Sequence, residues 1–147
     1  MKNLILFLVT LFFSTVAFSQ ARALRVENHT NCVQYYQVFG DELCVCGNKY
    51  NSPLIAINPG SVHNYTSSMP LGGTYPSTVA KSIVGTRIPN GPAQCQPAGG
   101  TVGEPGCGIP PVFAYLSFNS NCVPCANTTA RWFPATNCGQ ARLIFTP

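Results

Sequence analysis

Residues 112–118 read Val-Phe-Ala-Tyr-Leu-Ser-Phe, a run of apolar and aromatic side chains that follows two prolines and precedes an Asn-Ser-Asn segment. Aromatic and β-branched residues favour strands, and the flanking Pro and Asn residues mark its ends. Both faces of this run are mostly apolar, which is typical of a strand covered on two sides. We therefore expect a central core strand over residues 112–118.

Similar short runs recur along the chain, separated by Gly, Pro and Asn, and no segment after the first 19 residues shows a sustained helical repeat. The other expected strands are 23–27, 32–39, 43–46, 54–57, 62–65, 79–87, 129–133 and 141–145. About nine short strands with many cysteines favour an all-β, disulfide-stapled antiparallel β-sandwich, with a small β-barrel as the alternative.

The eight cysteines all lie beyond residue 31, and they are Cys32, Cys44, Cys46, Cys95, Cys107, Cys122, Cys125 and Cys138. An even number in a secreted chain of this size indicates a disulfide framework, here expected to have four bridges. Cys44 and Cys46 are two residues apart, so on a strand they face the same side, and we expect each to bond a distant partner. A bridge between Cys95 and Cys107 would close a loop, with a stabilisation of about 3 kcal/mol.

Cys122-Val-Pro-Cys125 has the spacing of a redox C-x-x-C motif. That chemistry needs a strand before the motif and a helix after it, whereas Ala126-Asn-Thr-Thr129 favours a turn and a strand. A zinc site made with Cys44 and Cys46 is a further alternative, but thiolates in an oxidising compartment are consumed as disulfides. Structural bridges are the expected role of these cysteines.

The chain begins with a basic residue, an apolar stretch over residues 4–13 and small residues up to Ser19. This order predicts a signal peptide over residues 1–19, cleaved near Ser19–Gln20. A membrane anchor is the alternative, but the apolar run is shorter than the ~20 residues that span a bilayer. We expect a single domain over residues 20–147, secreted or periplasmic or at the cell surface, with no membrane span after cleavage.

Charge is sparse, because residues 20–147 hold seven basic and four acidic side chains, scattered along the sequence. Nucleic-acid binding needs clustered Lys and Arg, so no nucleic-acid partner is expected. General acid–base catalysis could draw only on His29, His63 and the four carboxylates, of which Asp41 and Glu42 are the only adjacent pair. We assign no catalytic residue, no cofactor and no metal ligand.

Residues 89–111 contain twelve Gly or Pro in 23 positions, a composition that predicts a long loop without strand or helix. This loop is either a presented contact surface, with Gln96, Thr101, Val102 and Glu104 as its contact residues, or a tolerated insertion without a role in binding. The expected function is a non-catalytic extracellular or cell-surface binding or structural module. Its partner would be an extracellular protein or glycan, or a second copy through self-association. A disulfide-rich inhibitor or toxin-like effector acting through residues 95–107 is the alternative, and a small secreted enzyme comes third.

Overall fold

The computed structural model describes residues 20–95 and 98–147, and within them the chain is all-β. The predicted signal peptide and Gln96 lie outside the described residues. The strands are β1 (Ala23–Asn28), β2 (Gln34–Gly40), β3 (Tyr50–Asn51), β4 (Ile55–Ile57), β5 (Val62–Tyr65), β6 (Gly85–Pro89), β7 (Gly99–Gly103), β8 (Val112–Phe118), β9 (Pro124–Phe133) and β10 (Gln140–Thr146). Three short 3-10 helices, η1 (Met69–Leu71), η2 (Ala93–Cys95) and η3 (Pro105–Cys107), lie in the connections.

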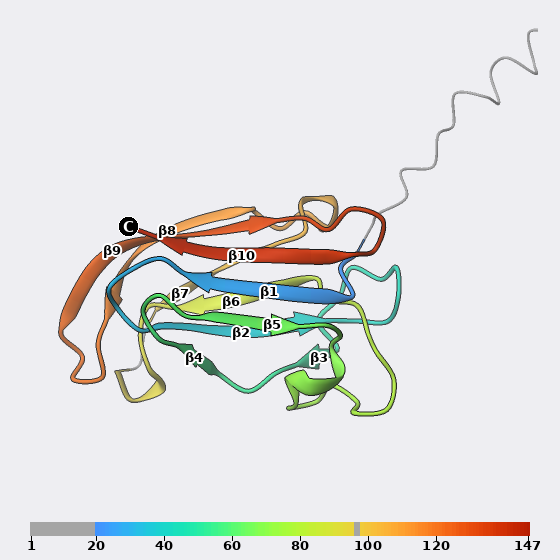
Figure 1. Ribbon diagram of the computed structural model, residues 1–147, viewed down its shortest axis with the longest axis horizontal. Coiled ribbons are helices and arrows are strands. Elements are labelled where there is room, and N and C mark those ends of the chain that lie inside the picture. Colours follow the sequence, from blue (N-terminus) through green and yellow to red (C-terminus); the bar gives the residue numbers. More distant parts are fainter. Residues whose placement is uncertain (1–19, 96–97) are drawn as a thin grey trace, which may run out of the picture.

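Two five-stranded open sheets pack face to face, so the predicted sandwich is confirmed and the alternative of a barrel is wrong. Sheet 1 has the order β5-β1-β10-β9-β8, and sheet 2 has the order β3-β2-β6-β7, with β4 also paired to β2 (Figure 1). All pairs are antiparallel except β1 and β10, which run in parallel from Ala23 opposite Gln140 to Asn28 opposite Phe145.

The core lies between the sheets and follows the two-residue period of the strands. In β1, Leu24 and Val26 are fully buried while Arg25 is exposed. Sheet 2 supplies Tyr36, Val38 and Ile88, and strands β9 and β10 of sheet 1 supply further large side chains: Trp132, Leu143 and Phe145. Only alternate residues of each strand reach this core.

The strand over residues 112–118 exists, but its predicted central position is wrong. It is β8, at one edge of sheet 1, and it runs beside β9 at the upper left of the molecule in Figure 1. Tyr115 is buried, whereas Val112 and Leu116 are 41% and 40% exposed. The sequence of the run is apolar on both faces, and the fold covers only one of them.

Two other predicted strands differ from the structure. Residues 43–46 form no strand, because Cys44 has a left-handed backbone with φ of 64° and the N–H of Val45 donates to the carbonyl of Glu42 in a turn. The strand expected over residues 79–87 begins only at Gly85. Conversely, the Gly- and Pro-rich segment 89–111, expected to be a loop, contains β7, which pairs with β6 over five residues. Glycine suits this pairing, because a Cβ at residue 99 or 103 would lie 2.6 Å from a backbone carbonyl oxygen.

Three disulfides are formed, where four were expected: Cys32–Cys125, Cys46–Cys107 and Cys95–Cys122. The predicted Cys95–Cys107 bridge is wrong, because β7 runs extended between these two cysteines and takes them to opposite ends of the strand. Cys46 has the distant partner expected of it, but Cys44 is an exposed free thiol. Cys138 is half-buried in the turn between β9 and β10.

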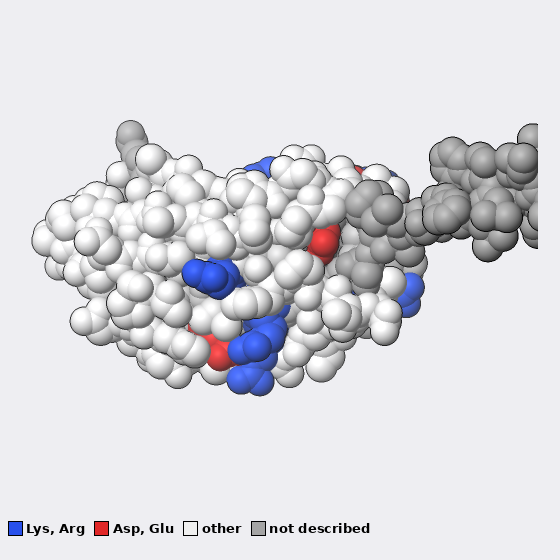
Figure 2. All heavy atoms as spheres, turned by 90° about the horizontal axis from the view of Figure 1, so that it is seen from above, with Lys and Arg blue, Asp and Glu red and all other residues white. Residues whose placement is uncertain are grey.

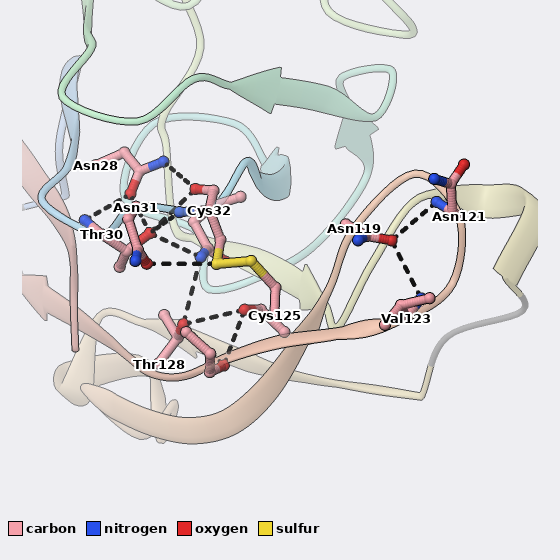
Figure 3. The surroundings of a disulfide bond; sticks show 12 residues. Asn28, Thr30, Asn31, Cys32, Asn119, Asn121, Val123, Cys125 and Thr128 are labelled. Atoms are coloured by element: carbon pink, nitrogen blue, oxygen red, sulfur yellow. Dashed lines mark hydrogen bonds between the residues drawn. A yellow bond between two sulfur atoms is a disulfide. The ribbon is translucent and has the colours of Figure 1, made fainter.

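Cys122 and Cys125 enter two separate bridges, so both the redox pair and the zinc alternative are wrong, and the structural role is confirmed. Figure 3 shows Cys32–Cys125 tying the start of β2 to β9, beside a buried polar network. In that network the Asn28 amide donates to the carbonyl of Cys32 at 2.8 Å, and the Gln34 amide donates to the Thr30 and Thr128 hydroxyls. This end of the sandwich is therefore fixed by a covalent bond and by hydrogen bonds together.

Candidate functional site

The outer face of sheet 2 carries a row of three polar side chains from neighbouring strands. Arg87 on β6 lies opposite Gln37 on β2 and opposite Thr101 on β7. In β6, Thr86 and Ile88 point into the core, so their neighbour Arg87 points outward. The three side chains thus share one solvent-facing row across the middle of the sheet.

Glycines flank this row, so the sheet has little side-chain cover there. Gly85 and Gly103 lie opposite one another on one side, and Gly99 lies opposite Pro89 on the other. A Cβ at residue 103 would lie 2.6 Å from the carbonyl oxygen of Val84, and a Cβ at residue 99 would lie 2.6 Å from that of Ile88. Larger residues cannot stand at these two positions without moving the backbone.

Two adjoining hollows of about 470 and 410 Å³ lie on this face, and Arg87 and Thr101 line both. We call them together the Arg87 groove. Apolar residues dominate the first hollow, including Leu54, Pro89 and Ala93. The second is lined by Phe39, Asn48, Ile109 and the Cys46–Cys107 disulfide, among others.

Neutral oxygens hold Arg87 in place. Its Nη1 donates to Oε1 of Gln37 at 3.1 Å and to Oδ1 of Asn51 at 2.8 Å, and its guanidinium carbon lies 5.5 Å from the centre of the Phe39 ring. Within residues 20–95 and 98–147 no carboxylate pairs with Arg87. Arg22 and Arg131 also have no ion pair in that part of the chain, but they are exposed to water, whereas Arg87 is half-buried.

The remaining nitrogens of Arg87, Nε and Nη2, make no hydrogen bond within the described part of the chain. A guanidinium presents its N–H groups as a planar fork that matches a carboxylate. The Arg87 groove therefore combines a positioned cation, free donors and apolar walls. Such a combination suits a ligand that has a carboxylate next to apolar groups.

Among the predicted contact residues that the structure describes, Thr101 alone lines this groove. Val102 is fully buried in the core, and Glu104 is 8% exposed, so neither is a surface contact. Burial raises the pKa of Glu104 above its ordinary value. The prediction treated the segment as a loop, whereas β7 directs Val102 into the core, and Glu104, the first residue after β7, is also buried.

Sequence reasoning missed Arg87, Gln37, Asn51 and Phe39. A signal was available in the sequence Gly85-Thr-Arg-Ile-Pro89. The charged Arg87 stands between Thr86 and Ile88, which suit a core, and Gly85 lies two positions before it. That pattern indicates a cation on a thinly covered sheet face. The amides that hold it come from residues 37 and 51, and only the fold brings them there.

The groups available for acid–base chemistry are divided among separate places. Oε2 of Glu27 lies 3.0 Å from Nε2 of His29, but neither residue lines any of the hollows described on the surface. Nδ1 of His63 lies 2.8 Å from the Tyr36 hydroxyl, and burial lowers the pKa of His63. These two histidines therefore belong to different clusters.

Glu42 forms a third cluster on the surface. Its carboxylate accepts hydrogen bonds from Lys81, Tyr50 and Lys49, which lower its pKa to about 2. The neighbouring Asp41 accepts the N–H of Glu42 within the turn. The Asp41–Glu42 turn thus also anchors Lys81 from a distant segment.

Within residues 20–95 and 98–147, no group of three or more His, Cys, Asp and Glu could hold a metal ion, and no helix is long and apolar enough to cross a membrane. Comparisons of the chain with family models, with curated proteins and with solved structures find no match.

Proposed function

We propose that this protein is a non-catalytic extracellular binding module that takes an extended apolar peptide with a carboxylate in the Arg87 groove. The observation that carries the proposal is the half-buried Arg87, which is fixed by two neutral amides and has no carboxylate partner in the described residues. A cation that the fold orients without neutralising is available to an anionic ligand.

The walls of the groove favour a peptide as this ligand. Leu54, Pro89 and Ala93 offer apolar surface on one side of Arg87, and Ile109 offers more on the other. Apolar side chains of a peptide would gain from this contact, while its carboxylate would meet the guanidinium fork. Asn48 and Thr101 supply neutral hydrogen-bonding groups for a peptide backbone.

The compartment is consistent with this role. Three disulfides indicate an oxidising environment. We place the mature protein outside the cytoplasm, secreted or periplasmic or at the cell surface, after cleavage near Ser19–Gln20. The stapled sandwich then serves as a rigid support for the groove.

Fluorescence anisotropy with a short leucine-rich peptide, labelled at its N-terminus, tests the proposal. The peptide with a free C-terminal carboxylate should bind at least about tenfold more tightly than the same peptide with a C-terminal amide, because the amide loses the charge-assisted bond. Arg87→Gln should remove this preference.

Arg131→Gln is the matched control, since it removes the same charge from an exposed position on the opposite sheet, and it should leave the preference intact. Equal binding of the acid and the amide, or no binding of either at millimolar concentration, would contradict the proposal. Binding of a uronic-acid oligosaccharide in place of both peptides would contradict the peptide assignment.

A further inference from the structure

The edge strands of the two sheets differ in length and in cover. In sheet 2, β3 and β4 have two and three residues, and β5 of sheet 1 has four. β7 is longer, but the N–H of Gly103 at its end donates to the carbonyl of Pro110. β8, with seven residues, is the longest edge strand in the described part of the chain.

The hydrogen bonds around β8 show which of its main-chain groups face outward. The N–H of Trp132 on β9 donates to the carbonyl of Pro111 at 2.7 Å, so residues 111, 113, 115 and 117 direct their main-chain groups toward β9. Residues 112, 114, 116 and 118 therefore face the open edge. The N–H of Phe118 donates to the carbonyl of Asn90, which covers that end.

Three residues remain available along this edge: Val112, Ala114 and Leu116. Within residues 20–95 and 98–147, their N–H and C=O groups make no hydrogen bond to another segment. Their side chains are exposed on the outer face of the sheet, where Val112 and Leu116 are 41% and 40% accessible. Edge strands usually carry charge, proline or other protection against pairing, and these positions carry none.

We propose that β8 pairs antiparallel with β8 of a second copy of this chain, with Ala114 on the two-fold axis. In this register Val112 lies opposite Leu116 of the partner subunit, and Leu116 lies opposite Val112 of the partner subunit. The outward main-chain groups of all three residues then form a hydrogen-bonded ladder, and sheet 1 continues through both copies.

The residue pattern favours a second copy over a different protein. Val112 and Leu116 stand two residues on either side of Ala114. When two copies of the strand run antiparallel about Ala114, each apolar side chain therefore meets another apolar side chain of similar size. β8 carries no charge, so self-pairing brings no like charges opposite one another. The surface is on sheet 1, and the proposal does not depend on the Arg87 groove.

Sedimentation equilibrium of the oxidised mature protein tests the pairing with two matched double variants. In V112K/L116K each introduced lysine faces a second one across the interface, and in V112E/L116K each introduced lysine faces a glutamate. The first variant should raise the dimer dissociation constant by at least about tenfold, and the second should keep it within about threefold of the wild-type value.

Val62→Lys is the control, because Val62 is 46% exposed on β5 at the opposite edge of the same sheet, and it should leave the dimer unchanged. All substituted side chains face solvent in one copy, and equal thermal transitions of the monomeric fractions will show that the fold is kept. A wild-type protein that is monomeric at millimolar concentration overturns the proposal. Equal weakening by the two double variants, or dimerisation that survives V112K/L116K, also overturns it.

Discussion

Arg142 on sheet 1 and Arg87 on sheet 2 both stand on the outer face of a sheet, but they differ in what holds them. Nη2 of Arg142 lies 3.0 Å from a carboxylate oxygen of Glu27, which also binds Arg25 and His29. Arg87 has two neutral amide oxygens in the same role. The first arginine is neutralised by the fold, and the second is only positioned by it.

The group that pairs with an arginine, a carboxylate or a neutral amide, therefore distinguishes these two side chains, although both carry the same charge. Seen from above, most of the surface is uncharged, and one group of basic side chains lies next to acidic atoms (Figure 2). Glu27 is 8% exposed at its side chain and joins neighbouring strands, since Arg25 is on β1 and Arg142 is on β10. We therefore expect Glu27 and the side chains that it pairs with to contribute to stability, and the proposed binding role rests on Arg87.

The largest effect on stability is expected from removal of the Cys46–Cys107 disulfide, which lines the Arg87 groove. C46S/C107S should lower the free energy of unfolding by about 4 kcal/mol, by the chain-entropy estimate for a sequence separation of 61. It should also weaken peptide binding, because Cys46 and Cys107 line the groove. Chemical denaturation and anisotropy measure the two effects, with Cys44 replaced by serine throughout to prevent thiol exchange.

C95S/C122S is the matched control for this disulfide. It opens a loop with a separation of 27, for an expected loss of about 3.5 kcal/mol, but neither cysteine lines the groove. Peptide affinity should stay at the wild-type value. Equal loss of affinity in both variants would mean that binding follows global stability and not the groove wall.

A smaller loss of stability is expected for Glu27→Gln, which removes the negative charge but keeps the shape of the side chain. Burial raises the pKa of Glu27, but the hydrogen bonds from Arg142, Arg25 and His29 outweigh it, so the pKa lies below the ordinary value of 4.5. At pH 7 the variant should be less stable by about 1 to 2 kcal/mol, because charge-assisted hydrogen bonds are lost.

The pH dependence of this difference follows from the direction of the shift. A pKa that is lower in the folded than in the unfolded protein stabilises the fold above the unfolded pKa, and the stabilisation is lost as pH falls through the folded value. The melting temperatures of the wild-type and Glu27→Gln proteins should therefore approach one another as pH falls below the ordinary pKa of 4.5, as thermal scans across pH will show. A constant difference down to pH 2 would contradict the role of the carboxylate.

Local patterns in the sequence predicted the layers of the fold well, but not the order of the strands. Val62–Tyr65 and Val112–Phe118 have the predicted bounds. Periodicity specifies which side chains share a face, but not which strand stands at an edge, because that depends on pairings between distant segments. The parallel pairing of β1 with β10 is one such contact, between the two ends of the described chain.

The candidate site was harder to predict for the same reason. Thr101 was expected as a contact residue and lines the groove, but the cation beside it comes from β6 and its two amides come from residues 37 and 51. Cysteine spacing also failed to indicate the pairing, since Cys32 and Cys125 are 93 residues apart. Loop closure becomes only slowly less favourable with length, so nearby cysteines have no decisive advantage.

The smallest effects should come from the two amides that hold Arg87, and they test whether its position matters as well as its charge. Gln37→Ala and Asn51→Ala each remove one acceptor from Nη1 and leave the other. Each should weaken binding of the carboxylate peptide by about two- to fivefold, corresponding to part of one hydrogen bond, and the double variant by more than the product of the two. Anisotropy titrations with the acid and amide peptides measure this. If the double variant still prefers the acid as strongly as the wild type, the charge of Arg87 suffices and its neutral partners play no part in recognition.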